Sequence, residues 1–234
     1  MCVSAAPIDD LVKQLPDFDE APFDVYSGYL EVPGPFNLTN YDKLMIHYQF
    51  HTSQSNSSTS DPLVTWHQGG PGGSSLYGLY GELGFFQLDD RGPHTNPYSW
   101  NSMANMLYLE SPAGSSNPIG FSWCEIEGEV QDYCSWDDVS QAEAYTHTLR
   151  AFFAAFPEYS DNDLYLSGES YAGQYLPNIA YWMLNSDTNA NQQISPAKNL
   201  RGIAVGNGCW GGDENTVICN GIHSEQNDLD MYWV

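Results

Sequence analysis

The chain has 234 residues, and its six Lys and Arg against thirty Asp and Glu give a formal net charge of −24 at pH 7. Hydrophobic residues make up 41% of it and aromatic residues 14%, enough to bury a core and to exclude an intrinsically disordered chain. A surface so poor in bases repels phosphate backbones and anionic lipid, so we expect no nucleic-acid and no membrane partner. Because carboxylates repel one another less in acid, we expect a vacuolar, lysosomal or secreted protein.

Five cysteines fit an oxidising compartment. Two pairs lie ten residues apart, which predicts two local disulfides, Cys124 with Cys134 and Cys209 with Cys219, and leaves Cys2 as a thiol. The alternative is a set of reduced core cysteines.

Two triplets, Asn37-Leu-Thr and Asn56-Ser-Ser, are candidate glycosylation acceptors. No apolar run approaches the roughly 18 residues that span a bilayer. The N-terminal segment lacks the apolar stretch of a secretory signal, and we expect the chain to start near its mature N-terminus.

The first predicted strands are 26–32 and 44–50, whose partly alternating β-forming residues indicate a half-exposed antiparallel pair. The polar stretch 51–60 is predicted to be a surface hairpin loop. Short apolar strands typical of a mainly parallel, buried sheet are predicted after it, at 63–66, 106–109, 164–166 and 203–205.

Two helices are predicted between these strands. The first is capped by Asp137 or Asp138, carries apolar residues at helical spacing and ends at Pro157. The second covers about 171–184. Alternating strands and helices indicate an α/β layered sheet in a single domain.

The junction between strand 164–166 and the second helix reads Gly168-Glu-Ser170-Tyr-Ala-Gly173, which contains the pattern G-x-S-x-G. A serine on a tight strand-to-helix turn needs small neighbours, and its hydroxyl then projects above the sheet edge as a nucleophile. The free N–H groups of the following helix point toward it. The alternative is an ordinary Gly-rich connection.

A second Gly-rich segment, 66–75, follows the third predicted strand and reads Trp-His-Gln-Gly-Gly-Pro-Gly-Gly-Ser-Ser. In a hydrolase of this kind, that loop supplies half of the oxyanion hole, and consecutive glycines allow close approach of backbone N–H groups. A phosphate-binding loop is the alternative, but the segment has no Gly-Lys-Ser/Thr and no G-x-G-x-x-G.

These motifs, together with segments 96–101, 105–114, 120–122, 156–159 and 206–208, resemble the serine carboxypeptidase family, which has the α/β-hydrolase fold. The resemblance implies that Ser170 is the nucleophile and that the N–H groups of Gly70 and Tyr171 form the oxyanion hole. It also implies a binding site for the carboxylate of a peptide or protein C-terminus, made by Trp66, Gln68, Gly69, Glu82 and Glu169. No cofactor and no metal are expected.

Glu82 and Glu169 form a pair in this interpretation. Two carboxyls in one apolar cleft do not both ionise cheaply, so one keeps its proton and can donate a hydrogen bond to the substrate carboxylate. Binding is therefore expected to be tightest in acid. The alternative for Glu82 is a solvated loop residue.

The chain also departs from the family. Gln68 stands where relatives usually have Asn, and Gly73 stands at a usual cysteine position. Residues 115–119 are an insertion, and 124–134 form an acidic loop to which we assign no role.

The motifs described above supply no general base for the serine. In this fold the chain order is Ser, then Asp or Glu, then His, and only 61 residues (234 − 173) follow Gly173. The candidates after the nucleophile are His223, Asp213, Asp228 and Asp230, and those before it are His47, His51, His67, His94 and His147. Neither set fits the expected order and spacing.

We therefore expect the N-terminal, nucleophile-bearing part of a serine-type carboxypeptidase, an incomplete α/β-hydrolase domain over 1–234 that lacks its last strands and is inactive alone. A missing C-terminal chain or segment would carry the Asp and His. Two alternatives stay open, a serine carboxypeptidase-like acyltransferase and a non-catalytic binding remnant.

Overall fold

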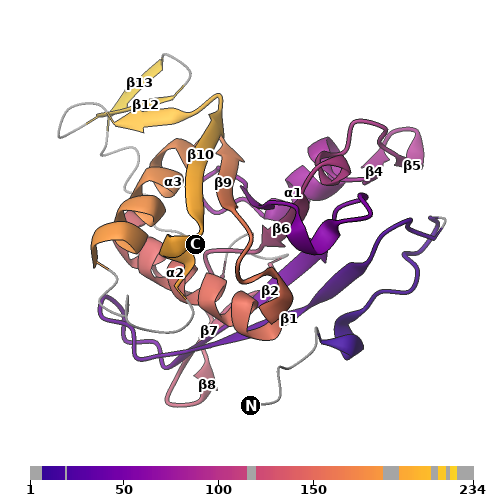
Figure 1. The fold of residues 1–234 in the computed structure, drawn as a ribbon. Coiled ribbons are helices and arrows are strands. Elements are labelled where there is room, and N and C mark those ends of the chain that lie inside the picture. Colours follow the sequence, from indigo (N-terminus) through magenta and orange to yellow (C-terminus); the bar gives the residue numbers. More distant parts are fainter. Residues whose placement is uncertain are drawn as a thin grey trace.

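A mixed sheet forms the centre of the molecule (Figure 1). This computed structural model describes residues 7–18, 20–114, 120–186, 195–211, 216–219 and 222–225. Within them the sheet has eight strands. Four parallel strands lie in the order β10 (Leu200–Gly206), β9 (Leu164–Glu169), β3 (Leu63–His67) and β6 (Asn105–Leu109). The short apolar segments of the sequence thus form the parallel part of the sheet, as predicted.

Antiparallel strands complete the sheet. β2 (Lys43–His51) pairs with β1 (Val25–Pro33) on one edge and with β6 and β7 (Trp123–Ile126) on the other, and β8 (Glu129–Val130) pairs with β7. The predicted pairing of the first two strands is confirmed. Half-exposure is wrong for β2, whose last four residues are all buried, because both of its faces are covered: Phe50 packs on Phe152, and His51 packs on Phe86.

The predicted hairpin at 51–60 is also wrong, because β6 lies between β2 and β3. The connection includes the short turn η2 (Ser58–Ser60) and passes the start of β6. There the amide of Asn105 donates hydrogen bonds to the carbonyl oxygens of Ser58 (2.6 Å) and Asp61 (3.0 Å). A buried side chain therefore provides hydrogen bonds to backbone carbonyls of a polar segment that was predicted to lie in solvent.

Two helices, α2 (Asp138–Ala155) and α3 (Ala172–Tyr181), pack together on one face of the sheet (Figure 1). The carboxylate of Asp137 caps α2 by accepting from the N–H groups of Val139 and Ser140, and Ser140 returns the bond in a capping box. Helix α3 ends at Tyr181 and continues as one wider turn, η6 (Trp182–Ser186), so its predicted extent is nearly right.

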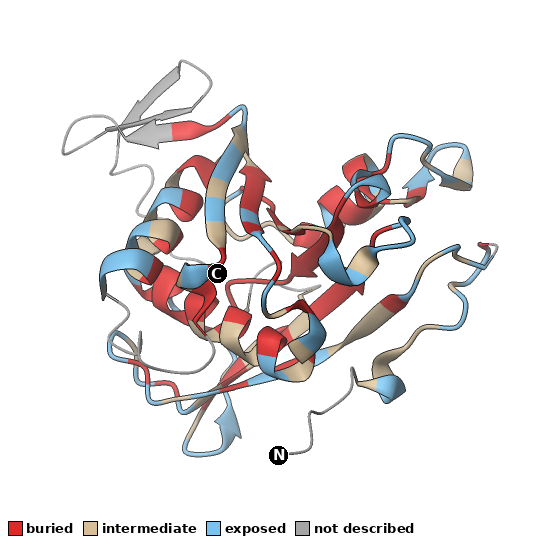
Figure 2. Cartoon of the chain, in the orientation of Figure 1, coloured by how far each residue is buried: buried red, intermediate tan, exposed pale blue. Residues whose placement is uncertain are grey.

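The other face carries α1 (Ser75–Gly78), the turn η3 (Leu79–Leu83) and a hairpin of β4 (Phe86–Asp89) and β5 (Gly92–Thr95). Alternation along β6 divides its side chains: Leu107 and Leu109 join the core under α2 and α3, whereas Met106 and Tyr108 pack with Trp66 on the opposite side. Figure 2 shows the buried strands at the centre and exposed positions along β10.

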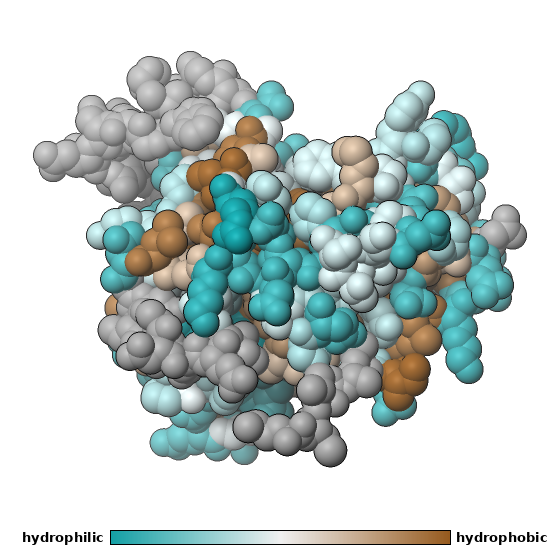
Figure 3. All heavy atoms as spheres, in the orientation of Figure 1, coloured by the Kyte–Doolittle hydropathy of each residue, from teal (hydrophilic) through white to brown (hydrophobic). Residues whose placement is uncertain are grey.

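The remaining elements are short. Single turns occur at η1 (Ile8–Asp10), η4 (Trp100–Ser102), η5 (Pro157–Tyr159) and η7 (Pro196–Lys198), and β11 (Cys209–Gly211), β12 (Thr216–Cys219) and β13 (Ile222–Glu225) form a small antiparallel sheet. Figure 3 shows one face of the molecule, which is largely hydrophilic with small apolar areas. Among the described residues, no helix has the length and apolar character to cross a bilayer.

The predicted disulfide between Cys124 and Cys134 is confirmed, and it encloses the β7–β8 hairpin within the acidic segment 124–134. Cys209 is also disulfide-bonded. The ladder places Cys219 opposite Cys209 in the backbone register, but the side chain of Cys219 lies outside the described part of the chain. Cys2 and the insertion 115–119 also lie outside it.

Candidate functional site

Ser170 lies on a sharp turn between β9 and α3, in the left-handed region with a φ of 57°. Such a φ is uncommon for a residue with a side chain and needs support from its neighbours. The Ser170 N–H donates to the carbonyl of Gly206 (2.9 Å), and the Ser170 carbonyl accepts from the N–H groups of Gly173 (3.0 Å) and Cys209 (2.7 Å). The end of β10 therefore holds the turn, and the hydroxyl is presented at the carboxyl ends of the parallel strands.

The Gly-rich loop packs directly against this turn. A Cβ added to Gly69 would lie 2.7 Å from Ser170 Cβ and 2.7 Å from the backbone nitrogen of Tyr171, so only glycine fits. The N–H groups of Gly69 and Gly70 donate no hydrogen bond to any described residue. Two free backbone donors thus belong to a loop in contact with the serine, which is the arrangement that stabilises a developing oxyanion or a bound carboxylate.

A cluster of polar side chains adjoins the loop. The side-chain amide of Gln68 donates to the Glu169 carboxylate (2.6 Å), and its oxygen accepts from the indole N–H of Trp66 (3.0 Å). Burial raises the pKa of Glu82, the charge of Glu169 raises it further, and a hydrogen bond from Gln68 opposes both. The structure therefore brings together the four side chains that the resemblance assigns to carboxylate binding, and the longer Gln68 belongs to the cluster.

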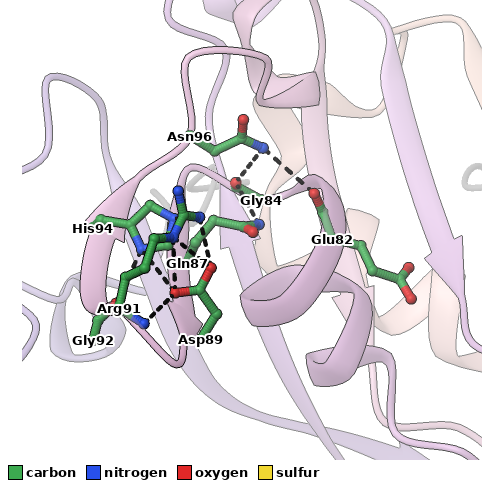
Figure 4. Close-up of polar contacts among 8 residues, drawn as sticks. All are labelled: Glu82, Gly84, Gln87, Asp89, Arg91, Gly92, His94 and Asn96. Atoms are coloured by element: carbon green, nitrogen blue, oxygen red, sulfur yellow. Dashed lines mark hydrogen bonds and ion pairs between the residues drawn. The ribbon is translucent and has the colours of Figure 1, made fainter.

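The position of Glu82 is fixed from the opposite side by Asn96 (Figure 4). The Asn96 amide donates to the carbonyl of Gly84 (3.2 Å) and, more weakly, to that of Glu82 (3.5 Å). In the same view the Glu82 carboxyl points away from the hairpin, where Arg91 pairs with Asp89 (2.6 Å) and contacts His94. The ion pair is thus separate from the carboxyl cluster.

A cavity of about 580 Å³ opens in front of the loop. Its wall includes Gln68, Gly69 and Gly70 and the aromatic residues Tyr77 and Phe121. This volume lies in the range of pockets that hold small molecules or single side chains. The loop residues Gly69 and Gly70, whose N–H groups are free, therefore line a space of this size.

Glu110, which also lines this cavity, is a site residue that the sequence reasoning did not single out. It is 2% exposed, accepts a hydrogen bond from the N–H of Phe121 (2.7 Å) and accepts another from the hydroxyl of Ser74. Burial raises its pKa, and the two hydrogen bonds oppose that effect. His47 Nδ1 lies 4.0 Å from the carboxylate. The sequence signal that could have identified Glu110 is its position directly after the apolar strand β6.

None of the histidines among the described side chains hydrogen-bonds to Ser170 Oγ. His67 is buried behind the loop, His51 is buried with its pKa lowered to about 3, and His94 lies in the β4–β5 hairpin. The other two, His47 and His147, contact aromatic rings. The side chain of His223 and the residues Asp213, Asp228 and Asp230 lie outside the described part of the chain.

The two candidate glycosylation acceptors differ in their surroundings. The backbone and side-chain N–H groups of Asn37 both donate to the buried carboxylate of Glu143, at 2.8 and 2.6 Å. Asn56 is exposed in the polar segment before β3, and its side chain has no partner among the described residues. A glycan at Asn56 would therefore leave the fold unchanged, whereas one at Asn37 would alter a buried contact.

Comparison with known proteins agrees with this geometry. A family model for serine carboxypeptidases matches residues 16–223. The lysosomal protective protein of Mus musculus is 41% identical over 214 residues, covering 90% of this chain and 40% of that protein. Serine carboxypeptidase ctsa-3.1 of Caenorhabditis elegans is 42% identical over 203 residues, covering 85% of this chain and 33% of that protein.

Among solved structures, the Saccharomyces cerevisiae prohormone-processing carboxypeptidase Kex1 superposes with a TM-score of 0.64 and 28% identity, covering 80% of this chain and 39% of that one. The chain spans about two-fifths or less of the length of these relatives. Its strand order and serine turn are those of the α/β-hydrolase fold predicted from the sequence. The match of the family model over most of the chain, with the relatives' identity, shows that the chain belongs to the serine carboxypeptidase family.

Proposed function

We propose that the protein is a serine-type carboxypeptidase, which releases C-terminal residues from peptides through an acyl-enzyme on Ser170. One observation carries the proposal: the free N–H groups of Gly69 and Gly70 and the Glu82–Glu169 carboxyl pair all adjoin the serine turn. A carboxypeptidase needs both a nucleophile and a receptor for a free carboxylate a few ångströms away.

The carboxyl pair explains how an acidic site binds an anion. Because burial and the neighbouring charge raise the pKa of Glu82, its carboxyl holds a proton into less acidic solution than usual and donates a hydrogen bond. The Gly69 N–H and the indole and amide of Trp66 and Gln68 are the further groups of this receptor. The substrate's last residue then occupies the cavity lined by Tyr77 and Phe121.

In the chemical step, Ser170 Oγ attacks the carbonyl carbon of the last peptide bond, and its proton passes to a general base. The carbonyl oxygen becomes an oxyanion held by the N–H groups of Gly70 and Tyr171. The C–N bond breaks, the base returns the proton to the leaving amine, and water hydrolyses the ester. We place the base and its acidic partner outside the described residues.

The net charge of −24 and the proton-dependent receptor both fit an acidic compartment. The mouse relative is named a lysosomal protein, and we propose a lysosomal, vacuolar or secreted location. Peptide and protein C-termini are the proposed substrates. Of the two glycosylation patterns, Asn56 is the proposed acceptor.

The test is the hydrolysis of an N-blocked dipeptide by the full-length protein, with release of the free C-terminal amino acid measured by mass spectrometry. We expect release from the dipeptide acid, little from the C-terminal amide, and none from Ser170→Ala. Transfer of the acyl group to another small molecule without hydrolysis, or release that persists in Ser170→Ala, would overturn the proposal.

A further inference from the structure

A layer of neutral side chains lies beneath the Gly-rich loop, on the face opposite the carboxyl pair. His67, the last residue of β3, is 1% exposed. Its ring stacks between the rings of Tyr145 from α2 and Tyr175 from α3, with centroids 5.1 and 4.4 Å away. Three elements, β3, α2 and α3, thus meet at one imidazole, whose hydrogen bonds go to Gln68 and Gln141.

The hydrogen bonds of His67 fix its tautomer. Its Nδ1 lies 3.3 Å from the carbonyl oxygen of Gln68, and its Nε2 lies 3.0 Å from the side-chain amide nitrogen of Gln141. A carbonyl only accepts, so the proton is on Nδ1, and Nε2 accepts from the Gln141 amide. Burial lowers the pKa of His67 to about 4, so the ring is neutral in all but strong acid.

The carbonyl that His67 holds belongs to the same peptide unit as the Gly69 N–H. In a trans peptide the C=O and N–H point in opposite directions from one rigid plane. A bond from His67 to the Gln68 carbonyl therefore turns the Gly69 N–H away from the buried layer. Because Gly69 has no Cβ, this plane has more rotational freedom without the bond than it would have next to another residue.

Tyr175 holds the other end of the loop. Its hydroxyl accepts a hydrogen bond from the Gly72 N–H at 3.1 Å, while its ring stacks on His67. The loop is thus fixed on both sides of Gly70. We propose that His67 and Tyr175 form a clamp of positioning residues that directs the Gly69 N–H toward the peptide C-terminus and the Gly70 N–H toward the oxyanion. This inference rests on the proposed carboxypeptidase function.

The test uses two substitutions that differ only in which ring nitrogen they replace. Asn places its amide nitrogen near the position of Nδ1 and can still donate to the Gln68 carbonyl, whereas Gln reaches the position of Nε2 and leaves that carbonyl without its donor. Dissociation constants of the full-length protein, carrying Ser170→Ala so that no substrate is turned over, are measured for an N-blocked dipeptide acid and its C-terminal amide. Thermal unfolding of each variant is followed in parallel.

We expect His67→Gln to weaken binding of the dipeptide acid by about five- to tenfold, the effect of one lost hydrogen bond, and to leave binding of the amide nearly unchanged. His67→Asn retains most of the affinity. Tyr175→Phe, which keeps the ring and removes the acceptor for Gly72, lies between them. Equal loss for acid and amide, or wild-type affinity in a folded His67→Gln, would overturn the clamp.

A second readout separates the clamp from the proposed function. In ¹⁵N NMR spectra, the Gly69 amide resonance is expected to shift in His67→Gln but not in His67→Asn, and the Gly72 amide to exchange faster in Tyr175→Phe. If the wild-type protein binds acid and amide equally while these shifts occur, the proposed function fails, but the positioning of the loop N–H groups by His67 and Tyr175 stands. If the amides of both glycines are unaffected, the clamp fails.

Discussion

The two sides of the Gly-rich loop carry opposite kinds of chemistry. Behind it lie His67, Tyr145 and Tyr175, whose rings stack and stay neutral. In front of it lie Glu82 and Glu169 with the amide of Gln68 between them. The rings behind the loop stay neutral except in strong acid, whereas the front has a carboxyl whose pKa is raised above its ordinary value.

This difference separates the position of the loop from the affinity of the site for an anion. Above the lowered pKa of His67, the rings of His67 and Tyr175 keep the same charge, and so do their hydrogen bonds to the loop. The carboxyl pair changes its charge with pH and so changes how well an anion binds. Substitutions at the back should act through the position of backbone N–H groups, and substitutions at the front should act through pH.

The largest effect is expected at Gly69, the loop residue that packs against the serine turn. Gly69→Ala places a Cβ 2.7 Å from Ser170 Cβ and from the Tyr171 nitrogen, so the loop or the serine turn must move. We expect a loss of about 1–3 kcal/mol in the free energy of unfolding and no measurable binding of a dipeptide acid. Urea unfolding and calorimetric titration measure the two. Wild-type affinity in Gly69→Ala would show that the loop does not pack on the turn in solution.

The next effect concerns the buried carboxylate at the front. Glu110→Ala leaves the Phe121 N–H and the Ser74 hydroxyl without their acceptor. We expect a cost of about 1–3 kcal/mol in urea unfolding. Glu129→Ala, at an exposed position of β8, is the matched control and should cost far less. Equal costs would mean that solvent reaches Glu110.

The pH dependence of stability gives a smaller effect with a definite sign. The pKa values of Glu82 and Glu110 are raised above the ordinary 4.5, so the folded chain binds more protons than the unfolded chain as pH rises past that value. Their contribution is fully present in acid and is lost as pH rises through the raised pKa values. The thermal unfolding midpoint of Glu82→Gln should therefore decrease less steeply with rising pH than the midpoint of wild type. Parallel slopes would contradict a raised pKa at Glu82.

The smallest effect is expected in the β4–β5 hairpin. Asp89 and Arg91 form an exposed ion pair, which lowers the pKa of Asp89 to about 2, and solvent screens such pairs. Arg91→Ala should leave both the thermal midpoint and the affinity for a dipeptide acid unchanged. A change in affinity would mean that the hairpin takes part in the front of the site.

The sequence was informative where chemistry and local pattern coincide. The parallel strands, both long helices, the serine turn and the 124–134 disulfide follow from apolar runs, capping residues and motif spacing. The burial of β2 was not predictable, because its partly alternating pattern does not show that other elements cover both faces of the strand. The hairpin prediction for 51–60 was wrong for a related reason. Asn105 can bond to the backbone carbonyls of this segment only because β6 lies between β2 and β3, which local sequence does not show.

The front of the site was predictable from the family motifs, whereas Glu110 and the layer behind the loop were not. Gln141, Tyr145 and Tyr175 lie on helices where their spacing indicates only a buried face. Their meeting at His67 depends on how α2 and α3 pack against β3, which is a tertiary property.

The central claim is that a titrating receptor for a C-terminal carboxylate faces a loop of fixed geometry. Its most direct test is the ratio of dissociation constants for a dipeptide amide and the dipeptide acid, measured from about pH 5 to about pH 7.5. We predict that the acid binds more tightly, that this preference declines as pH rises, and that Glu82→Gln removes the decline. A wild-type preference that is absent, or that does not change over this range, would contradict the account.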